Sequence, residues 1–328
     1  MTKYIIKRFG YMLLVFAAMS IILFFLYDMI PGDPARAEVQ HLKETLQPDQ
    51  YEEVYQQARD RLGLDDPVLT KYFKWVSGLL KGDLGNSSIH KKPVTEIIKT
   101  PLKNTIFINI FAVFAALIIT IPLGIYCAVK RNSTFDKVVQ VVTIVGYSIP
   151  AFIFGLLFIY LFAVRLGWFP VSGMNTPNLT GSWWVMFQDR MKYLALPLMV
   201  MTFSALGGLT RYVRAAMSDA LSMDYIKTAR AKGLKERVVI LSHAWRNALL
   251  PIVTLLVGWF TSVFYGSLII EKMFNLNGLG KYLIDSLNNQ DYNVVMAIQL
   301  LYIVVALSSN LITDISYGLV DPRVRVNR

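Results

Sequence analysis

Few side chains in this sequence could do chemistry, and their positions do not form a catalytic or metal-binding group. The three histidines, His41, His90 and His243, all lie outside the long apolar runs. Ser148 lies inside such a run, but no histidine or lysine accompanies it there to activate its hydroxyl as a nucleophile. The single cysteine, Cys127, has apolar neighbours, which predicts a small hydrophobic side chain. The sequence therefore predicts neither a catalytic residue nor a metal site, which argues against a membrane enzyme.

Residues 275–282 are the nearest approach to a phosphate-binding loop. Such a loop reads Gly-x-x-x-x-Gly-Lys-Ser/Thr, and its backbone amides surround phosphate oxygens. Here Asn275 replaces the first glycine, and Tyr282 follows Lys281. We therefore expect this chain to hold no ATP site and no cofactor of its own.

The apolar runs that surround these residues predict an all-α membrane protein. Of the 328 residues 55% are hydrophobic and 17% are charged, whereas soluble domains have about 25% charged residues. Six runs have close to the roughly 20 residues that a helix needs to cross a bilayer. These runs are residues 9–30, 106–129, 138–164, 194–210, 249–270 and 294–313.

The positive charges indicate how the six predicted helices are oriented. The N-terminus, residues 130–137, residues 211–247 and the C-terminus hold about half of the 33 lysines and arginines, but few of the 22 acidic residues. Basic loops remain on the cytoplasmic side. We therefore expect both termini in the cytoplasm, and the net charge of +11 reflects membrane topology instead of nucleic-acid binding.

The polar segment 31–103 follows the first predicted span and is expected to fold as an external subdomain. It separates an N-terminal segment, 1–30, from a five-helix core, 104–328. Residues 50–62 and 67–80 have helical spacing, and the second helix carries Tyr72, Phe73 and Trp75. These three aromatic side chains are either local core or a contact for an external partner.

Residues 211–247 form a cytoplasmic segment that is far longer than a connecting turn. Asp224 suits the first turn of a short helix, and Gly233 suits its end. Ala229 and Gly233 are four residues apart, so on one helix face they would let another protein approach the backbone. The alternative is a solvated basic loop with a frayed helix.

Residues 224–234, followed by His243-Ala-Trp-Arg-Asn247 and Pro251, resemble the EAA loop of ATP-binding-cassette (ABC) importer permeases. One departure is Arg246, where importer permeases often have proline. Further resemblance to the B-type subunit of the oligopeptide/dipeptide permease family extends over most of the chain. It is found at residues 4–8, 30–34, 61–64, 78–85, 167–170, 278–280 and 321–323.

This resemblance implies a type I ABC importer permease in the bacterial inner membrane. Its partners would be a second, related permease, two cytoplasmic ATPases that bind ATP and Mg²⁺, and an external solute-binding protein. The 224–234 helix would dock on an ATPase, and the 72–75 aromatic face is the candidate contact for the binding protein. The residues that match the coupling segment are Asp224, Tyr225, Ala229, Arg230, Ala231, Gly233, Leu234, His243 and Asn247.

Two alternatives to a peptide importer remain at this stage. An ion-coupled secondary transporter would need ion ligands near the membrane midplane and repeated halves, and the sequence contains neither. The resemblance also covers importers of nickel, glutathione or oligosaccharides, so peptide is a family-level inference.

Overall fold

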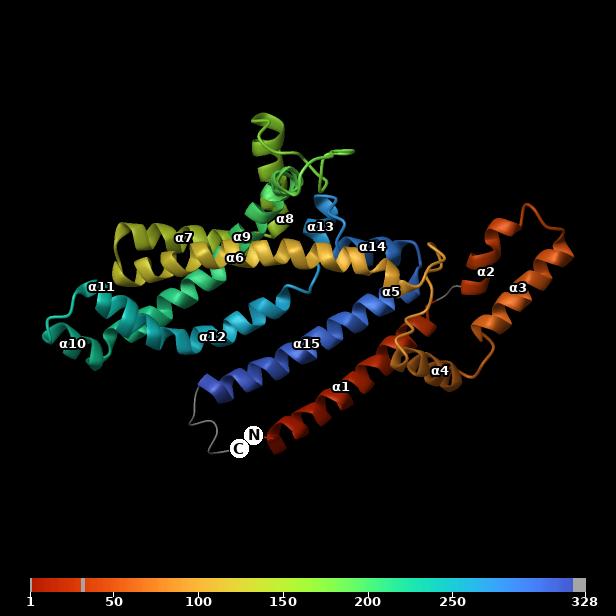
Figure 1. Ribbon diagram of the computed structural model, residues 1–328, viewed down its shortest axis with the longest axis horizontal. Coiled ribbons are helices and arrows are strands. Elements are labelled where there is room, and N and C mark those ends of the chain that lie inside the picture. Colours follow the sequence, from red (N-terminus) through yellow and green to blue (C-terminus); the bar gives the residue numbers. More distant parts are fainter. Residues whose placement is uncertain (1, 31–32, 321–328) are drawn as a thin grey trace. The chain divides into compact units, whose positions relative to one another are not determined.

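The computed structural model describes residues 2–30 and 33–320, and within these ranges the regular structure is helical (Figure 1). The predicted motif at 321–323 lies outside the described residues. The chain folds as two compact units. One comprises residues 102–281 and 308–320, and the other comprises residues 2–101 and 282–307.

Four helices are long and apolar enough to cross a membrane. They are α1 (Thr2–Asp28), α6 (Lys99–Val129), α9 (Trp183–Ser222) and α15 (Tyr292–Val320). Two bent pairs complete the set. The first joins α7 (Thr134–Ser148) to α8 (Ala151–Phe158) and the π-helix Ile159–Arg165. The second begins with α11 (Glu236–Val238) and the π-helix Val239–Ala244 and bends by 54° inside α12 (Trp245–Ser262), between Leu249 and Pro251. Counting each bent pair as one span gives the six spans that the sequence predicts.

The span predicted over residues 138–164 is not one straight helix. α7 ends at Ser148, and α8 leaves it at an angle of 102°. Ile149 is extended, with φ −88° and ψ 128°, because the ring of Pro150 disfavours the helical conformation in the preceding residue. The predicted loop at 211–247 is also shorter than expected, since α9 continues as a helix to Ser222.

In the first unit, α9 is the central helix and packs against α7, α8 and α12. The crossing with α7 is close at Gly207, where a Cβ atom would overlap the backbone of Thr143 and Tyr147. Val213 and Met217 on α9 are fully buried together with Ile252 on α12. Two short helices, α10 (Asp224–Ala231) and α13 (Leu268–Met273), pack on the same unit, and α14 (Leu279–Asn288) begins in it.

The second unit contains the predicted external segment. Its short helices are α2 (Pro34–Val39), the 3₁₀ turn Gln40–Leu42, α3 (Pro48–Leu62), α4 (Val68–Leu80) and α5 (Val94–Ile97). The helices predicted at 50–62 and 67–80 are therefore present as α3 and α4. α3 ends at Gly63, whose φ of 62° is a left-handed conformation that glycine adopts without strain.

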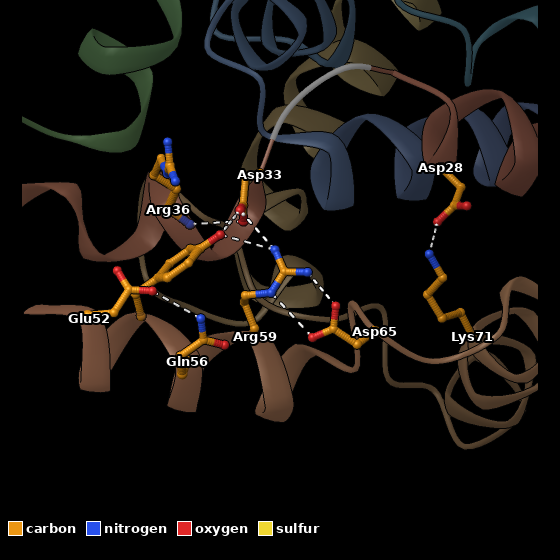
Figure 2. Close-up of polar contacts among 9 residues, drawn as sticks. Asp28, Asp33, Arg36, Glu52, Gln56, Arg59, Asp65 and Lys71 are labelled. Carbon is orange, nitrogen blue, oxygen red and sulfur yellow. Dashed lines mark hydrogen bonds and ion pairs between the residues drawn. The ribbon is translucent and has the colours of Figure 1, made fainter.

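A polar network ties α2 to α3 (Figure 2). Asp33 caps α2 by accepting a 3.1 Å hydrogen bond from the Arg36 amide, and it also accepts one from the Tyr55 hydroxyl. Arg59 bridges this carboxylate, at 3.2 Å, to Asp65 in the turn that follows α3. The hydrogen bonds that Arg59 donates hold the pKa of Asp65 below its usual value. Burial alone would raise the pKa of Asp33, but the bonds from Tyr55 and Arg36, with Arg59, outweigh it and lower that pKa.

This network predicts that the α2–α3 fold weakens in acid. A carboxylate whose pKa is lowered by folding stabilises the fold above its unfolded pKa, and this stability is lost as the pH falls through the folded pKa. The protection factors for amide hydrogen exchange over residues 33–65, which divide out the intrinsic pH dependence of exchange, are therefore expected to be constant near neutral pH and to fall below about pH 4. Arg59→Leu should exchange faster already at neutral pH and should depend less on acid. An identical acid response in the two proteins would contradict the prediction.

Candidate coupling site

The predicted helix that begins at Asp224 is present as α10 (Asp224–Ala231). Met223 is extended before it, and Asp224 lies in the first turn, where a negative charge favours the helix dipole. The Lys232 amide donates to the carbonyls of Thr228 and Arg230 at the other end. Gly233 follows with φ 76°, and the Leu234 amide donates back to the Ala229 carbonyl at 3.4 Å. The helix thus ends in a glycine turn.

One face of α10 packs into the first unit. Ile226 is fully buried and Ala229 is 5% exposed, and both lie in a cluster with Val213 and Met217 of α9. The expectation that Ala229 and Gly233 share an exposed face is therefore wrong. Ala229 is small because its side chain faces α9, and Gly233 lies beyond the end of the helix, in open space.

The opposite face of α10 is exposed. Asp224, Lys227, Thr228 and Ala231 recur at the three- and four-residue spacing of one helical face, and all four are exposed. Tyr225 is 40% exposed beside them, as is Leu234 after the turn. The two charged side chains on this face neutralise each other, because Lys227 pairs with Asp224 at 2.8 Å.

Arg230 connects α10 to the next helix. Its guanidinium donates to both carboxylate oxygens of Glu236 in α11, at 2.6 and 3.1 Å. The arginine therefore closes the turn around Gly233, which holds α10 and α11 in a fixed arrangement.

His243 and Asn247 lie further along, where the π-helix Val239–Ala244 runs into α12. The Asn247 side-chain amide donates to the His243 carbonyl at 2.7 Å, so it contacts the chain's own backbone. His243 is half-buried and Asn247 is exposed. The docking of these residues and of α10 on an ATPase stays a prediction.

A buried ion pair that the sequence analysis did not identify supports the same region. Asp136 in the first turn of α7 is fully buried and accepts two hydrogen bonds from Arg214 of α9, at 2.6 and 2.7 Å. It also accepts from the Gln140 side chain and the Asn132 amide. Arg214 follows Val213, which packs against α10. The pair therefore fixes α7 to the segment of α9 that holds α10.

A second buried carboxylate explains the glycines at 278 and 280. Glu271 in α13 accepts hydrogen bonds from the Thr105 hydroxyl and the Lys281 amide, each at 3.0 Å. Thr105 in turn accepts from the Leu279 amide at 2.8 Å. These groups cap the first turn of α14, whose amides have no partner within the helix. A Cβ at Gly278 would collide with the Glu271 carboxylate, so the segment that resembles a phosphate-binding loop is filled by the chain's own acid.

Removing the Glu271 carboxylate is expected to destabilise the protein. Burial raises the pKa of Glu271, although the Lys281 amide and Thr105 favour its charged form. Glu271→Ala leaves the Lys281 amide and the Thr105 hydroxyl without their acceptor, at roughly 1–3 kcal/mol for each unsatisfied group. Glu271→Gln keeps one of the two acceptor oxygens, so only one donor loses its partner and the loss should be smaller than that of Glu271→Ala. Thermal unfolding of the purified chain in detergent measures both, and equal losses would contradict the capping role.

Comparison with known families identifies the chain. A family described as binding-protein-dependent transport system inner membrane component matches residues 120–326, and the N-terminal domain of such components matches residues 1–125. The chain belongs to this family of transport-system membrane components. It is therefore a multi-pass membrane permease.

Curated relatives match this permease over nearly its whole length. It is 37% identical over 325 residues to the oligopeptide transport system permease protein AppB of Bacillus subtilis (strain 168), covering 99% of both chains. It is 34% identical over 325 residues to the glutathione transport system permease protein GsiC of Escherichia coli (strain K12), again covering 99% of both.

Solved structures confirm the predicted type I importer permease fold. The MetNI methionine ABC transporter in inward-facing conformations superposes with a TM-score of 0.52 at 17% identity, over 68% of this permease and 97% of that chain. An amino acid ABC transporter crystallised with histidines gives a TM-score of 0.50 at 16% identity, over 68% and 94%. At these identities the likeness concerns the fold alone.

The three aromatic residues predicted to contact a binding protein separate into two groups in the permease. The rings of Tyr72 and Trp75 pack against Phe24 of α1, with centroids 5.5 and 5.4 Å away. Phe73 is 66% exposed. Tyr72 and Trp75 are therefore half-buried on α1, whereas Phe73 is open, and contact of these residues with a binding protein stays a prediction.

Proposed function

We propose that this permease forms half of the translocation path of an ATP-driven importer of peptides. The observation that carries the proposal is the full-length likeness to an oligopeptide permease, at 37% identity. A second, related permease would complete the path, and an external binding protein would deliver the peptide. Both termini would be cytoplasmic, which places α10 on the side where ATP is available.

The chain itself would do no chemistry. Among the described residues there is no group of three or more His, Cys, Asp or Glu side chains that could hold a metal ion. ATP and Mg²⁺ would be bound by two partner ATPases, and this permease would convert their closure into movement of its helices.

The exposed face of α10 is the proposed contact with an ATPase. Its inner face is fixed to α9 through Ile226 and Ala229, so a push on α10 would displace α9. The Asp136–Arg214 pair would carry that displacement to α7. Packed helices move as rigid bodies in such transitions, which suits alternating access to the two sides of the membrane.

A cavity of about 220 Å³ between α6, α9 and α12 would contribute to the path. Its lining includes Asn109, Met201 and Trp259, and it contains no charged side chain. Such a lining would offer a few polar atoms without selecting one charged side chain, which suits peptides of varied sequence.

Reconstitution tests the proposal. The permease would be purified with its co-purifying partners, identified by mass spectrometry, and placed in proteoliposomes. We expect uptake of a labelled oligopeptide that requires ATP and stops when the ATPases carry an inactivating substitution. Uptake that follows a proton or sodium gradient without ATP would favour a secondary transporter. Competition by glutathione, nickel or an oligosaccharide, but not by peptides, would overturn the substrate assignment.

A further inference from the structure

The helix α4 carries an apolar stripe that no described residue covers. Leu69, Phe73, Val76 and Leu80 follow one another at four-, three- and four-residue intervals, which places them along one face of the helix. Leu69 is 63% exposed, Phe73 66% and Leu80 85%, and Val76 is half-buried. A stripe of this kind on a short helix needs an apolar partner.

The stripe lies directly beside the face by which α4 contacts α1. Tyr72 and Trp75 flank the stripe on one side and pack on Phe24. The Tyr72 hydroxyl is 3.0 Å from the Ser20 hydroxyl. Figure 1 shows α4 beside the C-terminal end of α1. The apolar sector of α4 is thus continuous, with one half on α1 and the other half open.

The other side of α4 is polar, and its charges are paired. Lys71 donates to Asp28, the last residue of α1, at 2.6 Å (Figure 2). Lys74 pairs with Asp66 at 2.6 Å, and Ser77 is exposed on the same side. The helix therefore has a wide apolar sector opposite a polar one, as in helices that lie in a membrane interface.

The contacts on α1 place α4 near one end of that helix. α1 is a candidate span, and α4 touches its last two or three turns, from Ser20 to Asp28. With a rise of about 1.5 Å per residue, Phe24 lies about 6 Å below Asp28. This depth matches the roughly 5–10 Å to which interfacial helices bury their apolar face.

We propose that α4 lies in the interface of the bilayer, with Leu69, Phe73 and Leu80 inserted among lipids. α1 itself is a candidate span with only 17% of its most apolar window buried, and Ile21, which shares the side of the helix that holds Phe24 and Asp28, is 41% exposed. Lipid around a membrane-spanning α1 would therefore lie next to the face that holds α4. Tyr72 and Trp75 take the position of the aromatic residues that anchor helices at this level. The inference goes beyond the proposed function and requires only that α1 spans the membrane.

Spin-label accessibility in lipid vesicles tests the proposal on the permease assembled with its partner subunits. Single cysteines would be placed in a Cys127→Ala background, and each nitroxide would be exposed to oxygen, which concentrates in lipid, and to a water-soluble nickel chelate. The positions on the stripe are Leu69→Cys, Phe73→Cys and Leu80→Cys, and the matched controls on the polar side are Thr70→Cys and Ser77→Cys.

The expected result is an oxygen-to-nickel collision ratio several-fold higher at each stripe position than at either control. The three stripe positions give independent readings, so the result can still be interpreted if one of the variants does not fold. A stripe that is accessible to nickel, and becomes protected only when the solute-binding protein is added, would make α4 a docking surface for that protein and overturn the proposal. Protection from both reagents in the assembled permease would place a protein there and overturn it equally. Neither result would bear on the peptide substrate.

Discussion

Ala231→Glu is expected to abolish ATP-driven uptake while the chain still inserts and assembles with the second permease. Ala231 lies on the exposed face of α10, so a longer side chain meets nothing in this chain. Glutamate also has a high helix propensity, and α10 should form. In the docked state the new carboxylate would be buried without a partner, at a cost of roughly 3 kcal/mol or more. That cost corresponds to about a hundredfold loss of docking affinity.

The measurement is peptide uptake in proteoliposomes, together with the ATP hydrolysis that loaded binding protein stimulates. Both are expected to fall. Thr134→Glu is the matched control, because it adds the same charge in the first turn of α7, where the helix dipole favours it. Normal uptake by Ala231→Glu would show that this face of α10 is not the ATPase contact.

Gly233 permits a related test that separates docking from backbone strain. Its φ of 76° strains most residues, but asparagine tolerates this conformation well. We expect Gly233→Asn to transport, and both Gly233→Asp, which tolerates the same conformation but adds a charge, and Gly233→Glu to lose transport with normal membrane insertion. Equal transport by Gly233→Asn and Gly233→Asp would assign Gly233 to the turn alone.

The elements that depend on local pattern could be predicted from the sequence. Long apolar runs predicted the spans, and Asp224 and Gly233 marked the two ends of α10. The break at Pro150 could not be predicted, because prolines are also tolerated inside membrane helices when neighbouring groups satisfy the backbone. Here the packing of α7 and α8 against α9 decides in favour of the break.

The contacts between distant residues explain the errors in the predicted site. Ala229 suits a docking face and an internal contact equally well, and only the position of α9 decides between them. Asp136 and Arg214 are 78 residues apart, and each looks like an ordinary charge in a cytoplasmic loop. Glu271 looks like the first polar residue of an outer loop, and its burial depends on the chain returning at Leu279. Counting the charged residues in each loop predicts the membrane topology, but it does not show which charged side chains pair with one another.

Breaking the Asp136–Arg214 pair is expected to destabilise the protein strongly, and by unequal amounts from its two sides. Asp136 is fully buried, whereas the Arg214 side chain is 19% exposed. Arg214→Ala therefore leaves a carboxylate with little access to water, and we expect a loss of about 3–5 kcal/mol in unfolding free energy. Asp136→Ala leaves a guanidinium that can turn toward solvent, so its loss should be smaller.

The double variant Asp136→Ala/Arg214→Ala separates the pair from the cavity that each truncation creates. Because neither charge is then left alone, its loss should be clearly smaller than the sum of the two single losses. Asp224→Ala is the exposed control: it breaks a 2.8 Å pair with Lys227, and such i,i+3 pairs contribute only about 0.2–0.5 kcal/mol. Thermal unfolding of the four variants in one detergent measures the series. If Arg214→Ala cost no more than Asp224→Ala, the attachment of α7 to α9 would not rest on this pair, and movement of the coupling helix would have to reach α7 by apolar packing at Gly207 instead.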